Sequence, residues 1–137
     1  MSRSGYDDCI DNWKLIKWRG AVTSALRGKR GQAFLREMRD ALDALPVKRL
    51  ITDELVAGGE VCALGAVGVS RGIPMGELDP YDEEYYNEIA AIFGISSAMV
   101  REIMYLNDEC FCGTPEQRYE RMRKWVGAWT SGQEPAP

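Results

Sequence analysis

The sequence predicts a mainly α-helical fold: a compact single-domain bundle with a helix-turn-helix-like pair and at most a small β-hairpin. Three observations predict it. Apolar residues recur at steps of three and four in several segments, capping residues precede two of these segments, and glycines and prolines separate them. A chain of 137 residues suits one domain. We expect a globular helical domain over 1–130 and a flexible tail over 131–137.

The N-terminal half contains two helical patterns. Residues 13–26 place apolar side chains near helical spacing, but Gly20 leaves open whether they form two short helices or one bent helix. After the GKRG stretch at 28–31, the clearest amphipathic pattern predicts a helix over 32–45. Pro46 ends that helix, because proline cannot continue the backbone hydrogen-bond ladder.

The middle of the chain is ambiguous between strand, loop and helix. Gly58–Gly59 lies between two apolar stretches and predicts a short hairpin or loop near 57–62. The acidic pair Asp53 and Glu54 before it would also suit a helix. A small-residue helix ending at Gly72 should follow, and then a surface connection.

The stretch EIAAIFGISSAMVREI, at 88–103, resembles the helix-turn-helix pattern. It predicts helices over 84–94 and 96–107. Gly94 suits a left-handed turn between them, and Ser96 suits the N-cap of the second helix. Such a pair either builds a core or enters a DNA groove, and we expect the packing role.

The C-terminal segment predicts a helix over 115–129. Thr114 stands at its N-cap, Pro115 follows at the first helical position, and Gln117 completes a capping-box arrangement. Taken together, the apolar stripes of the predicted helices assign these residues to the core: Phe34, Leu42, Ile89, Phe93, Val100, Ile103, Met122 and Val126.

Charge is distributed unevenly along the chain. The net charge is −4, but residues 13–49 carry ten Lys or Arg against three Asp or Glu, whereas residues 50–115 carry two against twelve. One explanation is that both regions are merely solvated. The other is a bipolar molecule whose faces steer it toward charged partners.

DNA binding is the alternative reading of the helix pair. The second helix would offer Ser96, Ser97, Ala98, Arg101 and Glu102 to a groove, with Arg101 as an exposed side chain. Affinity for DNA comes largely from phosphate contacts by Lys and Arg, and the adjoining segment is acidic. The basic 13–49 region would have to fold alongside. The candidate nucleic-acid-binding residues are Lys29, Arg30, Ser96, Ser97 and Arg101.

The residue types argue against most catalytic chemistry. The chain contains no histidine, which removes the commonest general base, and no phosphate-loop or dinucleotide motif occurs. We expect no enzyme and no cofactor. Cys110 and Cys112 form a CxC, but a zinc site would need the distant Cys9 and Cys62, so we expect free thiols and no metal.

The sequence also predicts a cytoplasmic protein. The first residues have no apolar leader, and the longest apolar run, Val61–Val69, is about half of a membrane span.

One resemblance adds a biological setting. The stretches RGQAFLREMRDALDALPVKRLI, GEVCALGAVG and TPEQRYERM, with the NDE at 107–109, are similar to a family of small uncharacterised proteins encoded in bacteriophages and prophages. The similarity extends from about Trp18 to Trp129. It implies a phage context in a bacterial host cell and transfers no functional residue.

Two functions follow as expectations. The first is an interaction protein that binds a host or phage protein through a charged face, inhibiting a nucleic-acid-handling defence complex in an anti-CRISPR-like manner. Its candidate partner-binding residues are Asp79, Asp82, Glu83 and Glu84, since carboxylates at intervals can occupy a surface meant for phosphates. The alternative is a helix-turn-helix transcriptional regulator that binds DNA.

Overall fold

A computed structural model describes residues 12–75, 78, 82, 84–109 and 113–130. Five residues with predicted roles lie outside these ranges, as does the predicted tail over 131–137; they are Cys9, Asp79, Glu83, Cys110 and Cys112.

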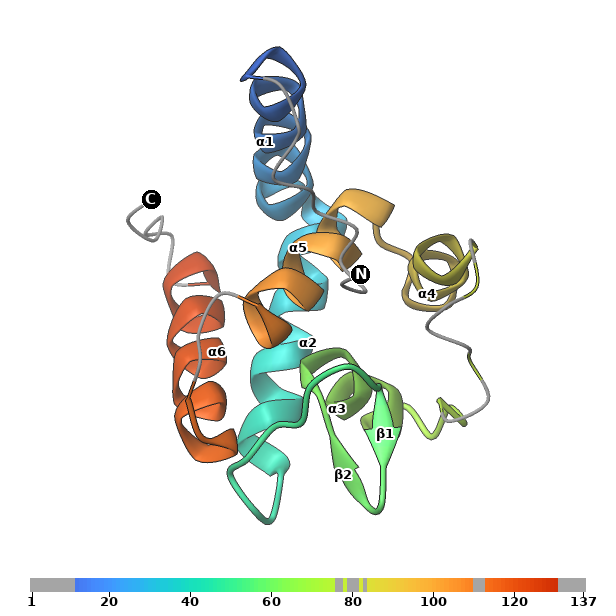
Figure 1. Ribbon diagram of the computed structural model, residues 1–137, viewed down its shortest axis with the longest axis vertical. Coiled ribbons are helices and arrows are strands. Elements are labelled where there is room, and N and C mark those ends of the chain that lie inside the picture. Colours follow the sequence, from blue (N-terminus) through green and yellow to red (C-terminus); the bar gives the residue numbers. More distant parts are fainter. Residues whose placement is uncertain (1–11, 76–77, 79–81, 83, 110–112, 131–137) are drawn as a thin grey trace.

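The described residues form six α-helices and one two-stranded antiparallel sheet, which confirms the mainly α fold (Figure 1). In Figure 1, α1 extends above the other helices, and α6 lies on the opposite side of α2 from the hairpin. The elements in chain order are α1 (Asn12–Arg27), α2 (Lys29–Ala44), β1 (Val56–Ala57), β2 (Glu60–Val61), α3 (Ala63–Ser70), α4 (Tyr85–Phe93), α5 (Ser97–Asp108) and α6 (Pro115–Thr130).

The N-terminal half decides one open alternative, in favour of a single helix across Gly20, and differs from the prediction in where the next helix begins. Helix α1 runs through Gly20 without a break, and α2 begins at Lys29, three residues earlier than predicted. Within GKRG, Gly28 is therefore the N-cap of α2 and the next three residues belong to its first turn. A Cβ on Gly31 would lie 1.9 Å from the carbonyl oxygen of Ala25, so the glycine permits a close approach of the two helices.

The middle segment folds as a hairpin that leads into a helix. Val56 pairs with Val61 across β1 and β2, as the Gly58–Gly59 turn predicts. The alternative prediction, a helix in the residues before the hairpin, was wrong. Asp53 has a φ of 68°, in the left-handed region, and residues 50–55 form an irregular connection. Helix α3 follows and ends close to Gly72, as expected.

Helix α5 is the centre of the bundle, because α1, α3, α4 and α6 all pack against it. Met99, Val100, Ile103 and Met104 are completely buried and form its apolar side. Every residue that the sequence assigned to the core is buried in the structure. The apolar stripes were therefore the reliable part of the prediction.

The connection between α4 and α5 has the predicted form. Gly94 ends α4 in the left-handed conformation with a φ of 71°, and the Ser96 hydroxyl accepts a hydrogen bond from the Met99 N–H at the start of α5. The two helix axes bend by 106° across this connection. Among the described residues, no single helix is long and apolar enough to cross a membrane, and α4 and α5 reach that length together only across this bend.

The cap of α6 also has the predicted geometry. The Thr114 N–H donates to Oε1 of Gln117 at 2.9 Å, and the Gln117 N–H donates to Oγ1 of Thr114 at 3.1 Å. These reciprocal bonds satisfy two donors that the first turn of a helix would otherwise leave unpaired.

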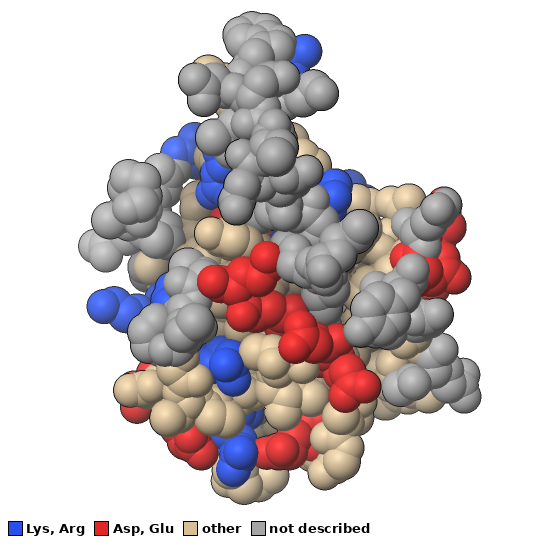
Figure 2. Space-filling view, viewed as in Figure 1, with Lys and Arg blue, Asp and Glu red and all other residues tan. Residues whose placement is uncertain are grey.

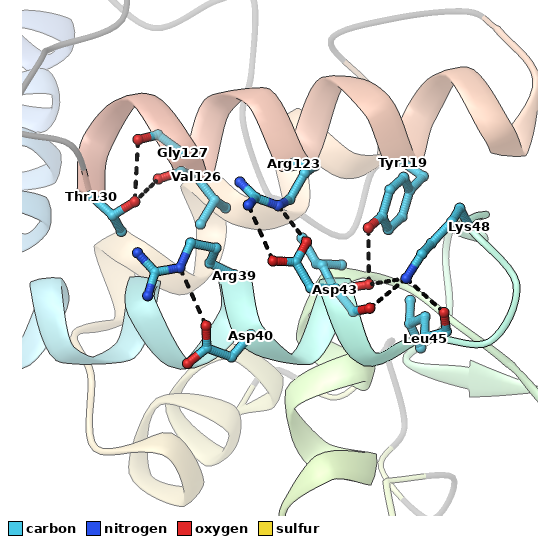
Figure 3. A network of polar contacts seen from close by, with 11 residues as sticks. Arg39, Asp40, Asp43, Leu45, Lys48, Tyr119, Arg123, Val126, Gly127 and Thr130 are labelled. Carbon is cyan, nitrogen blue, oxygen red and sulfur yellow. Dashed lines mark hydrogen bonds and ion pairs between the residues drawn. The ribbon is translucent and has the colours of Figure 1, made fainter.

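Helix α6 is joined to the C-terminal end of α2 by polar contacts (Figure 3). Arg123 donates to both carboxylate oxygens of Asp43, at 2.6 and 3.1 Å, and the Tyr119 hydroxyl donates to the Leu42 carbonyl at 2.9 Å. Lys48 donates to the Leu45 carbonyl at 2.8 Å, which covers a free carbonyl at the end of α2. The hydrogen bonds from Arg123 hold the pKa of the Asp43 carboxyl below its ordinary value.

We predict a pH-dependent loss of stability in Asp43→Asn. Because the pKa of Asp43 is lowered in the folded state, its stabilising effect is present above about pH 4 and disappears as the pH falls through the lowered pKa. The pair is half exposed, so the loss at pH 7 should be below about 1 kcal/mol. Urea unfolding at pH 7 and below pH 3 measures it. An equal difference between variant and wild type at both pH values would contradict this role.

Candidate functional site

Two of the four predicted partner-binding residues can be placed. Asp82 and Glu84 are exposed at the start of α4, with Glu88 exposed in its first turn. Oδ1 of Asp82 accepts the Glu84 N–H at 2.9 Å, and Oε2 of Glu84 accepts from Nδ2 of Asn87 at 3.1 Å. These carboxylates therefore help to begin α4, where the helix dipole favours negative charge, and they still face solvent.

The fold assembles a second acidic group that the sequence did not predict. The N–H of Asp53 donates to Oδ1 of Asp108 at 3.4 Å, although 55 positions separate the two residues. We use the term carboxylate cluster for these two residues and their chain neighbours, Glu54 and Glu109. Three of its members are exposed, and Asp108 is half-buried.

The buried side chain of Asn107 holds this cluster in position. Its side chain is buried, and Nδ2 donates to the Ile51 carbonyl at 2.8 Å while Oδ1 accepts the Ala63 N–H at 3.1 Å. Nδ2 also lies 2.8 Å from Oδ1 of Asp108. One amide thus fixes the chain before and after the hairpin against the end of α5. The NDE at 107–109 was the one sequence signal for this arrangement, but spacing alone did not connect it with Asp53.

Figure 2 shows how the acidic side chains are distributed on one face. Asp and Glu form a band where Figure 1 places the end of α5 and the segment leading into β1. A further acidic group lies over α4. Lys and Arg lie at the upper and left margins of this view and also among the acidic side chains in its lower part.

Many of the cations, by contrast, hold the fold together. Arg19 of α1 pairs with Glu102 of α5 through two hydrogen bonds of 2.7 and 3.0 Å. Arg71 pairs with Glu37 in the same bidentate way, at 2.6 Å for both bonds, and joins α3 to α2. Arg49 lies 2.6 Å from Glu60. The basic and acidic halves of the sequence thus partly neutralise each other inside one molecule.

Helix α5 has no open face for a DNA groove. Every residue from Ser97 to Asp108 is buried or half-buried. Glu102, expected to face a groove, is only 4% exposed because α1 covers it and Arg19 pairs with it. Arg101, expected to be exposed, is half-buried and lies over the rings of Trp18 and Tyr86, 5.0 and 4.7 Å from their centroids. Both expectations of exposure were wrong.

The five candidate nucleic-acid-binding residues separate into two groups. Lys29 and Arg30, at the start of α2, line one hollow together with Ser96. Ser97 instead donates from its hydroxyl to Oδ1 of Asn87 on α4 at 2.6 Å, and Arg101 is held by its two rings. The fold does bring part of the basic region to the beginning of α5, which the sequence alone did not show.

The described residues were also compared with the requirements of a metal site. No group of three or more Cys, Asp or Glu there could hold a metal ion. Cys62 is a buried free thiol at the N-cap of α3, where its sulfur accepts the Gly65 N–H at 3.4 Å. Its role there is structural.

No protein family, curated protein or solved structure shows significant similarity to the chain. What the arrangement can do is therefore argued from geometry and charge. It offers two exposed acidic groups, one hollow with two cations, and a central helix that is fully used in packing.

We predict that Arg101→Ala destabilises the fold. The substitution removes the guanidinium from two aromatic rings, and each such contact contributes about 0.5–1 kcal/mol, so the loss should be about 1–2 kcal/mol. The matched control is Arg36→Ala, because Arg36 is an exposed arginine of α2. It should change stability by less than about 0.5 kcal/mol. Urea unfolding measures the stability of both variants. Equal losses of stability would contradict a stabilising contact between Arg101 and the two rings.

Proposed function

We propose that the chain is a phage-encoded interaction protein that binds a host or phage protein through its exposed carboxylates. The observation that carries the proposal is the set of exposed carboxylates that the ion pairs of the fold leave without a partner. Arg19, Arg49 and Arg71 are engaged in ion pairs within the fold. Six exposed carboxylates of the described residues take part in none of these ion pairs; they are Asp53, Glu54, Asp82, Glu84, Glu88 and Glu120.

The chemistry of these carboxylates indicates the class of partner. Exposed acidic side chains at intervals present fixed negative charges and hydrogen-bond acceptors, as the phosphates of a nucleic acid do. A protein surface that binds nucleic acid carries the complementary Lys and Arg. The proposed partner is therefore a nucleic-acid-handling protein, such as a defence complex, which the chain inhibits by covering its basic surface in an anti-CRISPR-like manner.

Charge complementarity of this kind acts mainly on the rate and specificity of association. Oppositely charged surfaces steer the encounter and suppress wrong partners, and added salt weakens both effects. The proposed complex should therefore form rapidly at low salt and should compete with nucleic acid for the same surface.

DNA binding by the helix pair is the less favoured function. The start of α5 does lie beside Lys29 and Arg30. A recognition helix, however, must present several side chains to base edges in the major groove. The buried and half-buried residues of α5 leave no row of side chains for that task.

The test compares charge reversals on the acidic and basic sides. We predict that the immobilised wild-type chain captures a bacterial protein that short duplex DNA displaces. Glu54→Lys combined with Glu88→Lys should reduce capture by at least about tenfold, because like charges then face the partner's basic surface. The control is Arg36→Glu with Lys124→Glu, which reverses two exposed cations and should leave capture unchanged.

Two results would contradict the proposal. One is equal capture by the wild type and the acidic-side variant, or none by either. The other is direct binding of the wild type to random duplex DNA with a steep loss of affinity as salt rises, which is the behaviour of a DNA-binding regulator.

A further inference from the structure

One side of α1 faces solvent. Val22 and Leu26 are buried on the inner side of the helix, whereas six residues on the opposite side are exposed; they are Ile16, Lys17, Gly20, Ala21, Ser24 and Arg27. Ile16 is 63% exposed, and a Cβ on Gly20 would meet no atom of the described residues within 4 Å. In Figure 1, α1 also extends beyond the other helices. We use the term outer face of α1 for these six residues.

The outer face of α1 has a small-residue centre and basic ends. Helix α1 contains four Lys or Arg and no acidic residue, and Lys17 and Arg27 lie near the two ends of the exposed side. The small residues between them allow another helix to approach closely, because the side chains at a contact set the distance between two packed helices. A nucleic acid fits less well, since its phosphates need a row of cations along the face. The partner that fits is a helix with small and acidic side chains.

The chain itself has such a helix face, on α4. Ile89 and Phe93 are buried on one side of α4, whereas its other side is exposed from the N-cap to the last turn; the exposed residues are Glu84, Asn87, Glu88 and Ala91. No Lys or Arg occurs in residues 72–100, so no neighbouring cation along the chain offsets the two carboxylates. Because α1 and α4 both pack against α5 through their inner sides, their outer sides cannot meet within one copy.

We propose that the outer face of α1 binds the exposed side of α4 in a second copy of the chain, with Lys17 and Arg27 facing Glu84 and Glu88. Each copy provides both faces, so a two-fold axis makes the contact twice. Stable interfaces bury about 1,200–2,000 Å² in total, and the second contact doubles the area that one pair of helices covers. The dimer goes beyond the proposed function, because only copies of this chain take part. It withholds the α4 carboxylates from any other partner until the copies separate.

The test measures the mass of the purified full-length chain by sedimentation equilibrium, over a concentration series at low and at high salt. We expect a dimer at low salt that dissociates as added salt screens the opposite charges. The α1 variant, Lys17→Glu with Arg27→Glu, should be monomeric where the wild type dimerises, because like charges then face each other. The α4 variant, Glu84→Lys with Glu88→Lys, should be monomeric for the same reason.

An equal mixture of the α1 variant and the α4 variant is the most specific measurement. Both α1–α4 contacts between two different variants join opposite charges again, so the mixture should form a dimer that neither variant forms alone. Because an unfolded chain could not restore the dimer, this result also shows that both variants are folded. The control, Arg36→Glu with Lys124→Glu, reverses two exposed cations elsewhere and should dimerise as the wild type does.

Gly20→Trp tests the same contact without a change of charge. The fold leaves room for a side chain at this position, so the variant should stay folded, and the bulky ring should prevent the close approach of α4 and leave a monomer.

The proposal is overturned if the wild type remains a monomer at low salt, if the α1 variant, the α4 variant or Gly20→Trp still dimerises, or if the mixture stays monomeric. Binding of the wild type to duplex DNA through Lys17 and Arg27, in place of a second copy, would also overturn it. These measurements use the purified chain alone, so their failure leaves the capture of a bacterial protein as a separate test of the proposed function.

Discussion

The burial of α5 is the constraint on which the rest of the structure depends. Four helices pack against it, and its sequence places two charged residues, Arg101 and Glu102, next to each other within that packing. A buried carboxylate without a partner is strongly unfavourable, so Arg19 of α1 must lie where it can pair with Glu102. Arg101 in turn lies over Trp18 of α1 and Tyr86 of α4. Together, Arg101 and Glu102 thereby orient the two flanking helices, α1 and α4.

The burial of α5 determines which surfaces remain available to bind a partner. Because the sides of α5 are used in packing, only its ends are open to a partner. The beginning of α5 lies beside Lys29 and Arg30, and its end carries the carboxylate cluster through Asn107 and Asp108. The bipolar charge of the sequence is therefore partly neutralised in ion pairs between helices and partly concentrated at the two ends of one central helix.

The features of the fold that depend on residues close together in the sequence could be predicted. Apolar stripes, Gly94, Ser96 and the Thr114–Gln117 cap all depend on residues within one helix or its ends, and all have the expected geometry. The start of α2 at Lys29 could not be predicted, because a glycine that permits close helix packing looks the same in a sequence as one that separates two helices. The surfaces depend on distant pairs such as Arg19 with Glu102 and Asp53 with Asp108, and no spacing rule connects these.

Native-state hydrogen exchange tests the central position of α5 most directly. The amides of Ile103 and Met104 should exchange only through global unfolding, with a free energy equal to that from urea unfolding, because both side chains are completely buried among the packed helices. Exchange of these amides through a local opening, several kcal/mol below the global value and below that of α2, would contradict it. Such a result would mean that α5 separates from the bundle and exposes a face that a partner could bind.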